Sequence, residues 1–330
     1  MLSTGINNTV FPAIHPSPVE DRGASRSRRV KFKKLFITAL SLIAPATLFY
    51  PGALAKTKSY KFKKTDTKFI AHAGYRKKGK KYRKNSHTAF VAAGKAGFWG
   101  CEADIRETKD HVLVCSHHNN NDRRGCNIRG TTWKTLHRRY PNLTTCGSFL
   151  RTCVKYKMVP TIDLKVRLSN TGYKKLFDLL YTNKYKSRGN YCYFIKNGKK
   201  VTFRKEAQIA SLYMTNKYYR KEGRNPNMIS PAINYCRKHY GFTPTAMYFI
   251  NTKRKGEMYQ AKSLCNKYHL KWIGLREPQT TKKFADYCKK NNIKLNCWVA
   301  TGNVPESRAR LYKFIHNYKI DSYTTDKVWW

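Results

Sequence analysis

Acidic side chains are scarce in this sequence, which holds 18 Asp and Glu residues against 67 Lys and Arg residues. The resulting formal net charge of +49 disfavours a compact state and attracts polyanions such as nucleic acid, anionic lipid or a phosphate-rich cell envelope. The chain is nevertheless 41% hydrophobic, so its 330 residues can form a large core. With so few carboxylates, each Asp or Glu inside an apolar run becomes a candidate for a specific role.

Zinc-binding patterns and internal repeats are also missing. The ten cysteines form no C-x-x-C pair and no Cys/His cluster with zinc spacing, which argues against a zinc site. An even number of cysteines in an exported chain suggests some disulfides. Cys101, Cys115 and Cys297, however, lie in apolar strand-like runs, where a thiol behaves as a small hydrophobic group.

The first 55 residues have the pattern of a secretory signal peptide. A basic run, Arg26–Lys34, precedes the uncharged segment Leu35–Ala55, which ends in Ala-Leu-Ala, a small-x-small cleavage site. The alternative is an uncleaved anchor, because 21 uncharged residues nearly span a bilayer, but Pro45 and Pro51 argue against it. We therefore divide the chain into a leader with signal peptide, a basic linker and one folded domain: residues 1–55, 56–67 and 68–330.

Most of the charge lies outside this leader. Residues 1–55 contain seven basic and two acidic residues, so the rest of the chain keeps a net charge of +44. For a secreted or envelope-associated protein we expect an anionic cell envelope or membrane surface as the partner of this charge, and no specific nucleic acid. The alternative is a solvated surface that adheres to polyanions without a role in catalysis.

Short apolar runs alternate with amphipathic segments from residue 68 onward. Strands are predicted at 68–72, 100–105 extended by 111–117, 159–165, 207–213, 245–250, 271–275, 293–299 and 321–325. Helices are predicted at 87–97, 147–157, 172–183, 225–240, 256–269, 280–291 and 305–318. This order predicts an α/β fold, a (β/α)8 TIM barrel, with an additional hairpin around Asn197-Gly198.

Chemistry-bearing side chains gather at the predicted carboxyl ends of the strands, where TIM barrels carry their catalytic groups. Glu102, Asp104 and Asp163 offer three hard oxygen ligands, the set that Ca²⁺ or Mg²⁺ prefers. The alternative pairs each carboxylate with a neighbouring lysine. An unpaired carboxylate in an apolar strand is costly, however, and one divalent cation, Ca²⁺ or Mg²⁺, would remove that cost.

Two histidines, a lysine and a tryptophan complete the candidate site. His72 and His117 each end an apolar strand, and although a lone histidine there is usually structural, two beside a metal resemble an acid/base pair. Lys165 shares a strand face with Asp163 and is suited to hold a phosphate oxygen. The ring of Trp298 either packs against the carbon skeleton of a substrate or fills space in the protein core.

Several segments together resemble the glycerophosphodiester phosphodiesterase family: FIAHAG, NSHTAFVAAGKAGFWGCEADIRETKDHVLVCSH, PTIDLK, NCWVATG and DSYTTD. Their order and gaps are similar to the family's motifs from about residue 68 to 327, densely over 87–117 and loosely over 170–260. The resemblance implies a TIM-barrel enzyme that binds one divalent cation. Such an enzyme would hydrolyse glycerophosphodiesters to glycerol 3-phosphate and an alcohol. The resemblance also implies roles for six residues: Glu102 and Asp104 as metal ligands, His72 and His117 as catalytic histidines, Lys165 as a phosphate contact and Trp298 as the substrate-side aromatic residue.

The sequence departs from the family's usual pattern at several positions. Ala73 replaces an arginine, Ser86 and His87 stand at the usual Glu-Asn pair, His118 replaces an acidic residue, and Asp163 stands where Glu is commoner. Loss of the arginine removes a bidentate phosphate clamp. Arg76 and Arg106 are the candidates to replace it.

Two other functions fit part of the pattern. Phospholipase D toxins of the same barrel type also use a metal, two histidines and an Asp-x-Lys sequence, which would make lysolipids the substrates. A catalytically weakened barrel that binds the envelope as a cationic adhesin is favoured by Ala73 and His118. The TKDHVLVCSH segment is closer to the diesterases, and the intact histidines oppose the adhesin. We expect a phosphodiesterase for glycerophosphodiesters, with glycerol-phosphate polymers or lipid headgroups as further candidate substrates.

The signal pattern predicts the N-terminus of the exported protein. Cleavage after Ala55 leaves Lys56 as the first residue, because the basic run and uncharged segment both precede it. Terminal sequencing of secreted protein checks this, and secreted chains that still begin before residue 35 would show that the segment is not removed.

Overall fold

Eight parallel strands form a closed barrel in the computed structural model of this chain, which describes residues 68–76, 82–118, 127–181, 193–196, 199–202, 207–213, 228–250, 257–298 and 307–328. In order around the barrel the strands are β1 (Lys68–Ala71), β2 (Gly100–Glu107), β4 (Val159–Leu164), β7 (Gln208–Tyr213), β8 (Ala246–Ile250), β9 (Trp272–Arg276), β10 (Lys294–Trp298) and β11 (Ser322–Thr325). Pairing of β1 with both β11 and β2 closes the ring. The predicted TIM barrel is confirmed.

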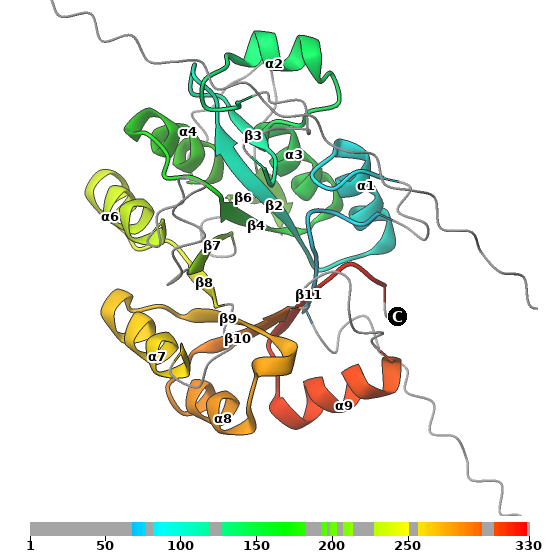
Figure 1. Ribbon diagram of the computed structural model, residues 1–330, viewed down its shortest axis with the longest axis vertical. Coiled ribbons are helices and arrows are strands. Elements are labelled where there is room, and N and C mark those ends of the chain that lie inside the picture. The colour runs from blue at the N-terminus through cyan, green and yellow to red at the C-terminus, as the bar shows by residue number, and fades with distance from the viewer. Residues whose placement is uncertain are drawn as a thin grey trace, which may run out of the picture. The chain divides into compact units, whose positions relative to one another are not determined.

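Within the described ranges, seven helices connect successive barrel strands and cover the outside of the barrel (Figure 1). They are α1 (His87–Ala96), α3 (Cys146–Tyr156), α4 (Asn170–Tyr181), α6 (Ile229–Tyr240), α7 (Glu257–Tyr268), α8 (Lys282–Lys290) and α9 (Arg308–Tyr318). A short 3-10 helix, η3 (Glu277–Gln279), follows β9. Each predicted helix therefore exists, with ends displaced by a few residues.

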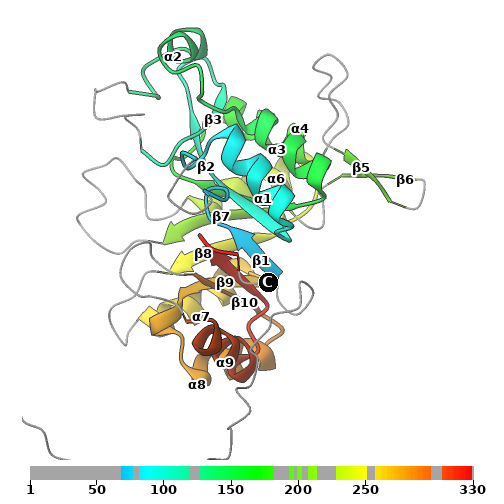
Figure 2. The same cartoon turned by 90° about the vertical axis from the view of Figure 1, so that its right-hand side faces the viewer.

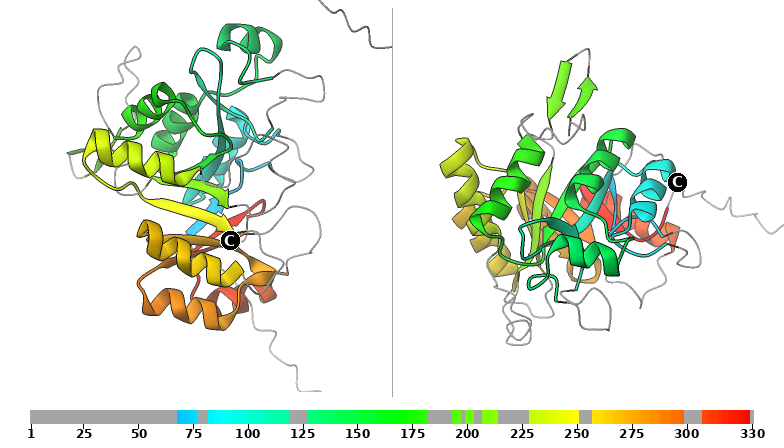
Figure 3. Two further views of the ribbon diagram at one scale, coloured as in Figure 1. Left: turned by 60° about the vertical axis from the view of Figure 1, so that its left-hand side comes forward. Right: turned by 90° about the horizontal axis from the view of Figure 1, so that it is seen from above.

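Two hairpins depart from simple alternation. The predicted run 111–117 forms β3 (Leu113–Cys115), which turns back and pairs antiparallel with the end of β2, and α2 (Trp133–Arg139) follows it. Strands β5 (Tyr193–Lys196) and β6 (Lys199–Thr202) pair antiparallel, which confirms the hairpin predicted around Asn197-Gly198, although those two residues lie outside the described part. Figures 2 and 3 show this second hairpin extending beyond the helices.

Local signals in the sequence begin and end the helices that flank the first strands. Ser86 caps α1 by accepting a hydrogen bond from the backbone N–H of Ala89 at 3.2 Å. Gly97 ends the same helix in the left-handed conformation, with φ of 79°. Lys157 takes the equivalent position after α3, with φ of 54°. These caps fix where the chain leaves each helix and enters the next strand.

The hydrophobic core lies mainly between the barrel and its helices, and every residue of β2 is buried. Strands of a parallel barrel are covered on both faces, which explains the near-continuous apolar runs in the sequence. All eight cysteines of the described part are buried. Five of them are free thiols that form no disulfide: Cys101, Cys115, Cys265, Cys288 and Cys297. Cys126 and Cys192 lie outside the described residues.

No helix in the described part of the chain is both long enough and apolar enough to cross a membrane. The uncharged segment Leu35–Ala55 lies outside the described residues.

The close approach of α1 to α3 generates a test of the packing. Alanine normally stabilises a helix by about 1 kcal/mol relative to glycine. A Cβ on Gly94 would lie 2.2 Å from Cγ of Tyr156. A Cβ on Gly147 would make only ordinary van der Waals contacts, with Nη1 of Arg151 at 3.6 Å and Cδ2 of Leu179 at 3.9 Å. We expect Gly94→Ala to lower the free energy of unfolding by about 1–3 kcal/mol, and Gly147→Ala to leave it unchanged or raise it. Urea denaturation measures both, and a gain in stability from Gly94→Ala would contradict this packing.

Candidate active site

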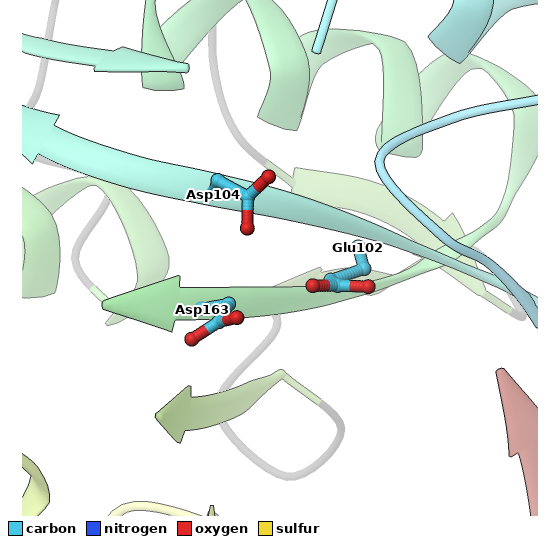
Figure 4. Close-up of side chains that lie close together, drawn as sticks. All are labelled: Glu102, Asp104 and Asp163. Carbon is cyan, nitrogen blue, oxygen red and sulfur yellow. The ribbon is translucent and has the colours of Figure 1, made fainter. Parts of the chain in front are cut away.

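Three carboxylates meet where β2 and β4 lie side by side. Asp104 and Asp163 are direct partners in the parallel register of the two strands, and Glu102 lies two residues before Asp104. Residues two apart on a strand share a face, so all three side chains point to the same region (Figure 4). Each offers an oxygen within 4.8 Å of the others, and all three residues are buried. The structure thus brings the three predicted metal ligands together.

Lys165 lies directly against two of these carboxylates. Its Nζ is 2.8 Å from Oδ1 of Asp104 and also donates to Oδ2 of Asp163. Burial disfavours the charged form of Asp104, but the attraction of Lys165 and His117, together with hydrogen bonds from Lys165 and Asn85, outweighs it and holds the pKa of Asp104 well below its usual range. Burial likewise opposes the charge on Lys165, yet Asp104 and Asp163 raise the pKa of its ammonium. The ion pair expected as the alternative to a metal therefore exists for two of the three carboxylates.

Glu102 is the carboxylate of the cluster that forms no ion pair with Lys165. Burial raises the pKa of Glu102 to about 8, and repulsion from Asp104 and Asp163 adds to the rise against the attraction of His72. Three ionised carboxylates and one lysine leave two negative charges to be balanced. Hard oxygen donors with this remaining charge fit one divalent cation such as Ca²⁺ or Mg²⁺.

His72 follows β1 and is held by a carboxylate from the last strand. Its Nδ1 lies 3.1 Å from Oδ1 of Asp326 and 3.1 Å from Nζ of Lys84. An ionised carboxylate only accepts and a lysine ammonium only donates, so Nδ1 bonds to Asp326 when it carries a proton and to Lys84 when it does not. With the proton on Nδ1, Nε2 is left to exchange protons. Burial opposes the charge on His72, but Glu102 and the hydrogen bond to Asp326 outweigh it and raise its pKa above the ordinary value. Asp326 thus orients the ring and favours its protonated form.

His117 lies just beyond β3, the strand that turns back along β2. The backbone oxygen of His117 accepts a hydrogen bond from Nη2 of Arg106 at 2.9 Å, and the neighbouring N–H of Ser116 donates to the backbone oxygen of Asp104 at 2.8 Å. These contacts fix the His117 backbone beside the carboxylates. Arg106 is therefore engaged in supporting the histidine segment.

A cavity of about 720 Å³ is shared by the two histidines and Asp104, whereas Glu102, Asp163 and Lys165 lie behind Asp104, outside its lining. Its walls include His72, His117 and Asp104, together with His118 from the same segment as His117. The structure places both predicted histidines along one cavity with Asp104. Their chemical roles stay predictions.

Trp298 is placed apart from this cavity wall. It ends β10 and packs with Phe249 of β8, with the ring centroids 6.2 Å apart, while the guanidinium of Arg276 lies 5.7 Å from its ring centroid. Its buried Nε1 has no hydrogen-bond partner among the described residues. The structure therefore supports a packing role for the ring and leaves substrate contact as a prediction.

The placement of the usual Glu-Asn pair at Ser86 and His87 is corrected by the structure. Ser86 caps α1, whereas Asn85 reaches the site: its Nδ2 donates to Oδ2 of Asp104 at 2.6 Å and its Oδ1 accepts from the N–H of Asp104 at 3.0 Å. Asn85 adopts φ of 60°, a left-handed conformation that asparagine tolerates better than most residues. Lys84 and Asn85 are thus the residues that contact His72 and Asp104, while Ser86 caps α1 at the cavity wall.

Sequence reasoning missed Asp326 as well as Lys84 and Asn85. Asp326 ends the DSYTTD segment and directly follows the last barrel strand. Because TIM barrels carry catalytic groups at the carboxyl ends of their strands, this position could have identified it. Lys84 and Asn85 lie in a loop before a helix, where no periodic pattern singles them out.

Clustered carboxylates, a lysine and two histidines around one cavity, at the carboxyl ends of TIM-barrel strands, define a hydrolase site for an anionic substrate. Residues 72–328 match the glycerophosphoryl diester phosphodiesterase family, and the chain belongs to this family. It is a phosphodiesterase. Comparison with curated proteins finds no match.

Solved structures of phosphodiesterases share the fold. A glycerophosphodiester phosphodiesterase from Thermotoga maritima has 17% identity and a TM-score of 0.53, over 79% of this chain and 94% of that one. One from Parabacteroides distasonis has 19% identity and a TM-score of 0.55, over 79% and 93%. An Oleispira antarctica phosphodiesterase in complex with the product sn-glycerol-3-phosphate has 13% identity and a TM-score of 0.53, over 78% and 92%.

The acidic cluster generates a test of metal binding. Glu102→Gln removes one of the charges that balance a dication, so we expect affinity for Ca²⁺ or Mg²⁺ to fall on the order of tenfold or more, with a smaller metal-dependent rise in Tm. Calorimetric titration and thermal unfolding measure both. Asp286→Asn, which removes an exposed carboxylate on α8, is the matched control. If Glu102→Gln keeps wild-type metal affinity, the carboxylates form only ion pairs.

Proposed function

We propose that this chain is an exported, metal-dependent phosphodiesterase that hydrolyses glycerophosphodiesters to glycerol 3-phosphate and an alcohol. The observation that carries the proposal is the shared cavity, in which His72 and His117 stand beside Asp104 of the acidic cluster. Family membership supports the reaction type. The product bound in the Oleispira antarctica structure supports glycerol 3-phosphate as the product.

Glu102, Asp104 and Asp163 would hold the cation, either Ca²⁺ or Mg²⁺. When bound, it would supply positive charge that stabilises the phosphate oxygens as negative charge builds up on them. Lys165, fixed between Asp104 and Asp163, adds a cation on the same side of the site. Its ion pairs hold the ammonium protonated and in place for a phosphate oxygen.

The two histidines would move the protons of the reaction. One accepts the proton of the attacking water, or of the substrate's own glycerol hydroxyl if a cyclic phosphate forms first. The other donates a proton to the alcohol oxygen as its bond to phosphorus breaks. Nε2 of His72 suits either part, because Nδ1 is occupied by Asp326.

The proposal of export is based on the N-terminal leader, and the proposal of an anionic binding partner is based on the net charge of the chain. The basic run and uncharged segment before Lys56 support secretion. A net charge of +44 in the remaining chain supports attachment to an anionic envelope or membrane surface. Two alternatives remain open to the same assay: a phospholipase D-like enzyme for lysolipids, and a cationic envelope-binding protein without turnover.

An assay of product release tests the proposal. We expect the protein beginning at Lys56 to release glycerol 3-phosphate from glycerophosphodiesters of several alcohols, and to stop when a chelator removes the metal. His72→Ala and His117→Ala should each lower kcat by about 10²–10⁴-fold, because each removes a positioned proton donor or acceptor. His316→Ala, which changes an exposed histidine on α9, is the matched control.

Three results would replace the proposal. Choline or cyclic phosphate released from lysolipids would identify the phospholipase D-like enzyme. Binding to poly(glycerol phosphate) without any turnover would identify the binding protein. Full activity in both histidine variants would exclude these two residues as the proton carriers.

A further inference from the structure

Three basic side chains line the cavity from the segment between β1 and α1. They are Arg76, Arg83 and Lys84, and they lie along the same cavity as His72 and Asp104. The acidic residues among the described cavity lining are Asp104 and Asp326. This part of the cavity is therefore richer in cations than the reaction centre itself.

The reaction centre balances its own charges once the proposed cation is present. Glu102, Asp104 and Asp163 contribute three negative charges, and Lys165 with a divalent cation contributes three positive ones. The single negative charge of a phosphodiester is then matched by one protonated histidine. The basic residues of the β1–α1 segment are not needed for this balance.

Lys84 is already compensated by a neighbour. Its Nζ lies 3.6 Å from Oδ1 of Asp326, and its side chain is only 26% exposed. Arg76 lines the same cavity as this pair, and its positive charge helps to lower the pKa of both Lys84 and Asp326. With Lys84 and Asp326 cancelling, the positive charge of Arg76 is in surplus beside the catalytic histidine.

Arg76 does not simply take the place of the arginine that the family usually has at position 73. Ala73 is fully buried, with φ of 51°, and its carbonyl accepts the backbone N–H of Asn85 at 2.9 Å. Arg106, the other candidate to replace that arginine, supports the His117 backbone. Position 73 therefore supplies no cation to the cavity. The cations that line it are Lys84, whose Nζ lies 3.1 Å from Nδ1 of His72, and Arg76 and Arg83 of the same segment.

We propose that Arg76, with Lys84 and Arg83 beside it, forms a subsite for a second phosphate group on the alcohol part of the substrate. The inference rests on the proposed function and names its substrate class: glycerophosphodiesters whose alcohol carries a further phosphate, such as short glycerol phosphate oligomers. Guanidinium groups bind phosphate oxygens in bidentate fashion. A cavity of about 720 Å³ is in the size range that holds a drug-sized ligand, so both phosphates have room.

The test compares two substrates that differ by one phosphate. One substrate is glycerophosphoglycerol, and the other is the same diester with a phosphate on its distal glycerol. The protein beginning at Lys56 is assayed with each, and the ratio of the two kcat/KM values is measured. We expect the wild type to prefer the phosphorylated diester by about tenfold or more, the value of one charge-assisted hydrogen bond or more. Arg76→Gln should bring the ratio close to one, and Arg76→Lys should retain part of it.

A matched control separates the subsite from the general basicity of the protein. Arg151→Gln removes one positive charge from the exposed face of α3, so it should leave the ratio at the wild-type value. An equal loss of preference in Arg151→Gln and Arg76→Gln would overturn the subsite in favour of long-range attraction. So would a wild-type ratio near one, or an unchanged ratio in Arg76→Gln. If the wild type hydrolyses neither diester, the proposed function itself fails.

Discussion

The parallel register of β2 and β4 places Asp104 directly beside Asp163, and the rest of the site is arranged around this juxtaposition of like charges. Neither side chain can avoid the other, because both belong to adjacent strands and point to the same face. Lys165 compensates them through two ion pairs, one of them at 2.8 Å. The third carboxylate, Glu102, keeps a raised pKa of about 8 in this setting. A dication in the cluster would relieve the repulsion that the fold imposes.

A second set of charges orders the histidine on the other side of the cavity. Asp326 comes from the last strand and His72 from the first, and closure of the barrel between β11 and β1 brings them to 3.1 Å. Asn85 performs a similar task for Asp104 through two hydrogen bonds. Few acidic residues are available in this basic chain, and the described site uses at least four of them. The scarce carboxylates are concentrated where they position chemistry.

The basic residues divide into those that balance the site and those that surround it. Lys165 and Lys84 each face a carboxylate within 4 Å, so their charges serve the internal balance of the site. Arg106 supports the backbone of His117. Arg76 lines the cavity beyond these pairs, which makes it suited to meet charge that the substrate brings. Surface charge acts over about 8 Å in physiological salt, so it concentrates anionic substrates without selecting among them.

The sequence alone determined the barrel, because buried parallel strands and amphipathic helices leave strong periodic patterns, and it identified seven candidate site residues from the ends of those strands. Tertiary structure decided which candidates meet. Register placed the three carboxylates together, whereas Trp298 packs against Phe249 outside the described lining of the histidine cavity. Lys84 and Asn85 could not be found from periodicity, because a loop has none, and their contacts with His72 and Asp104 are made only in the folded chain. Contacts between the first and last strands, such as His72 with Asp326, exist only once the ring has closed, since 254 positions separate the two residues along the chain.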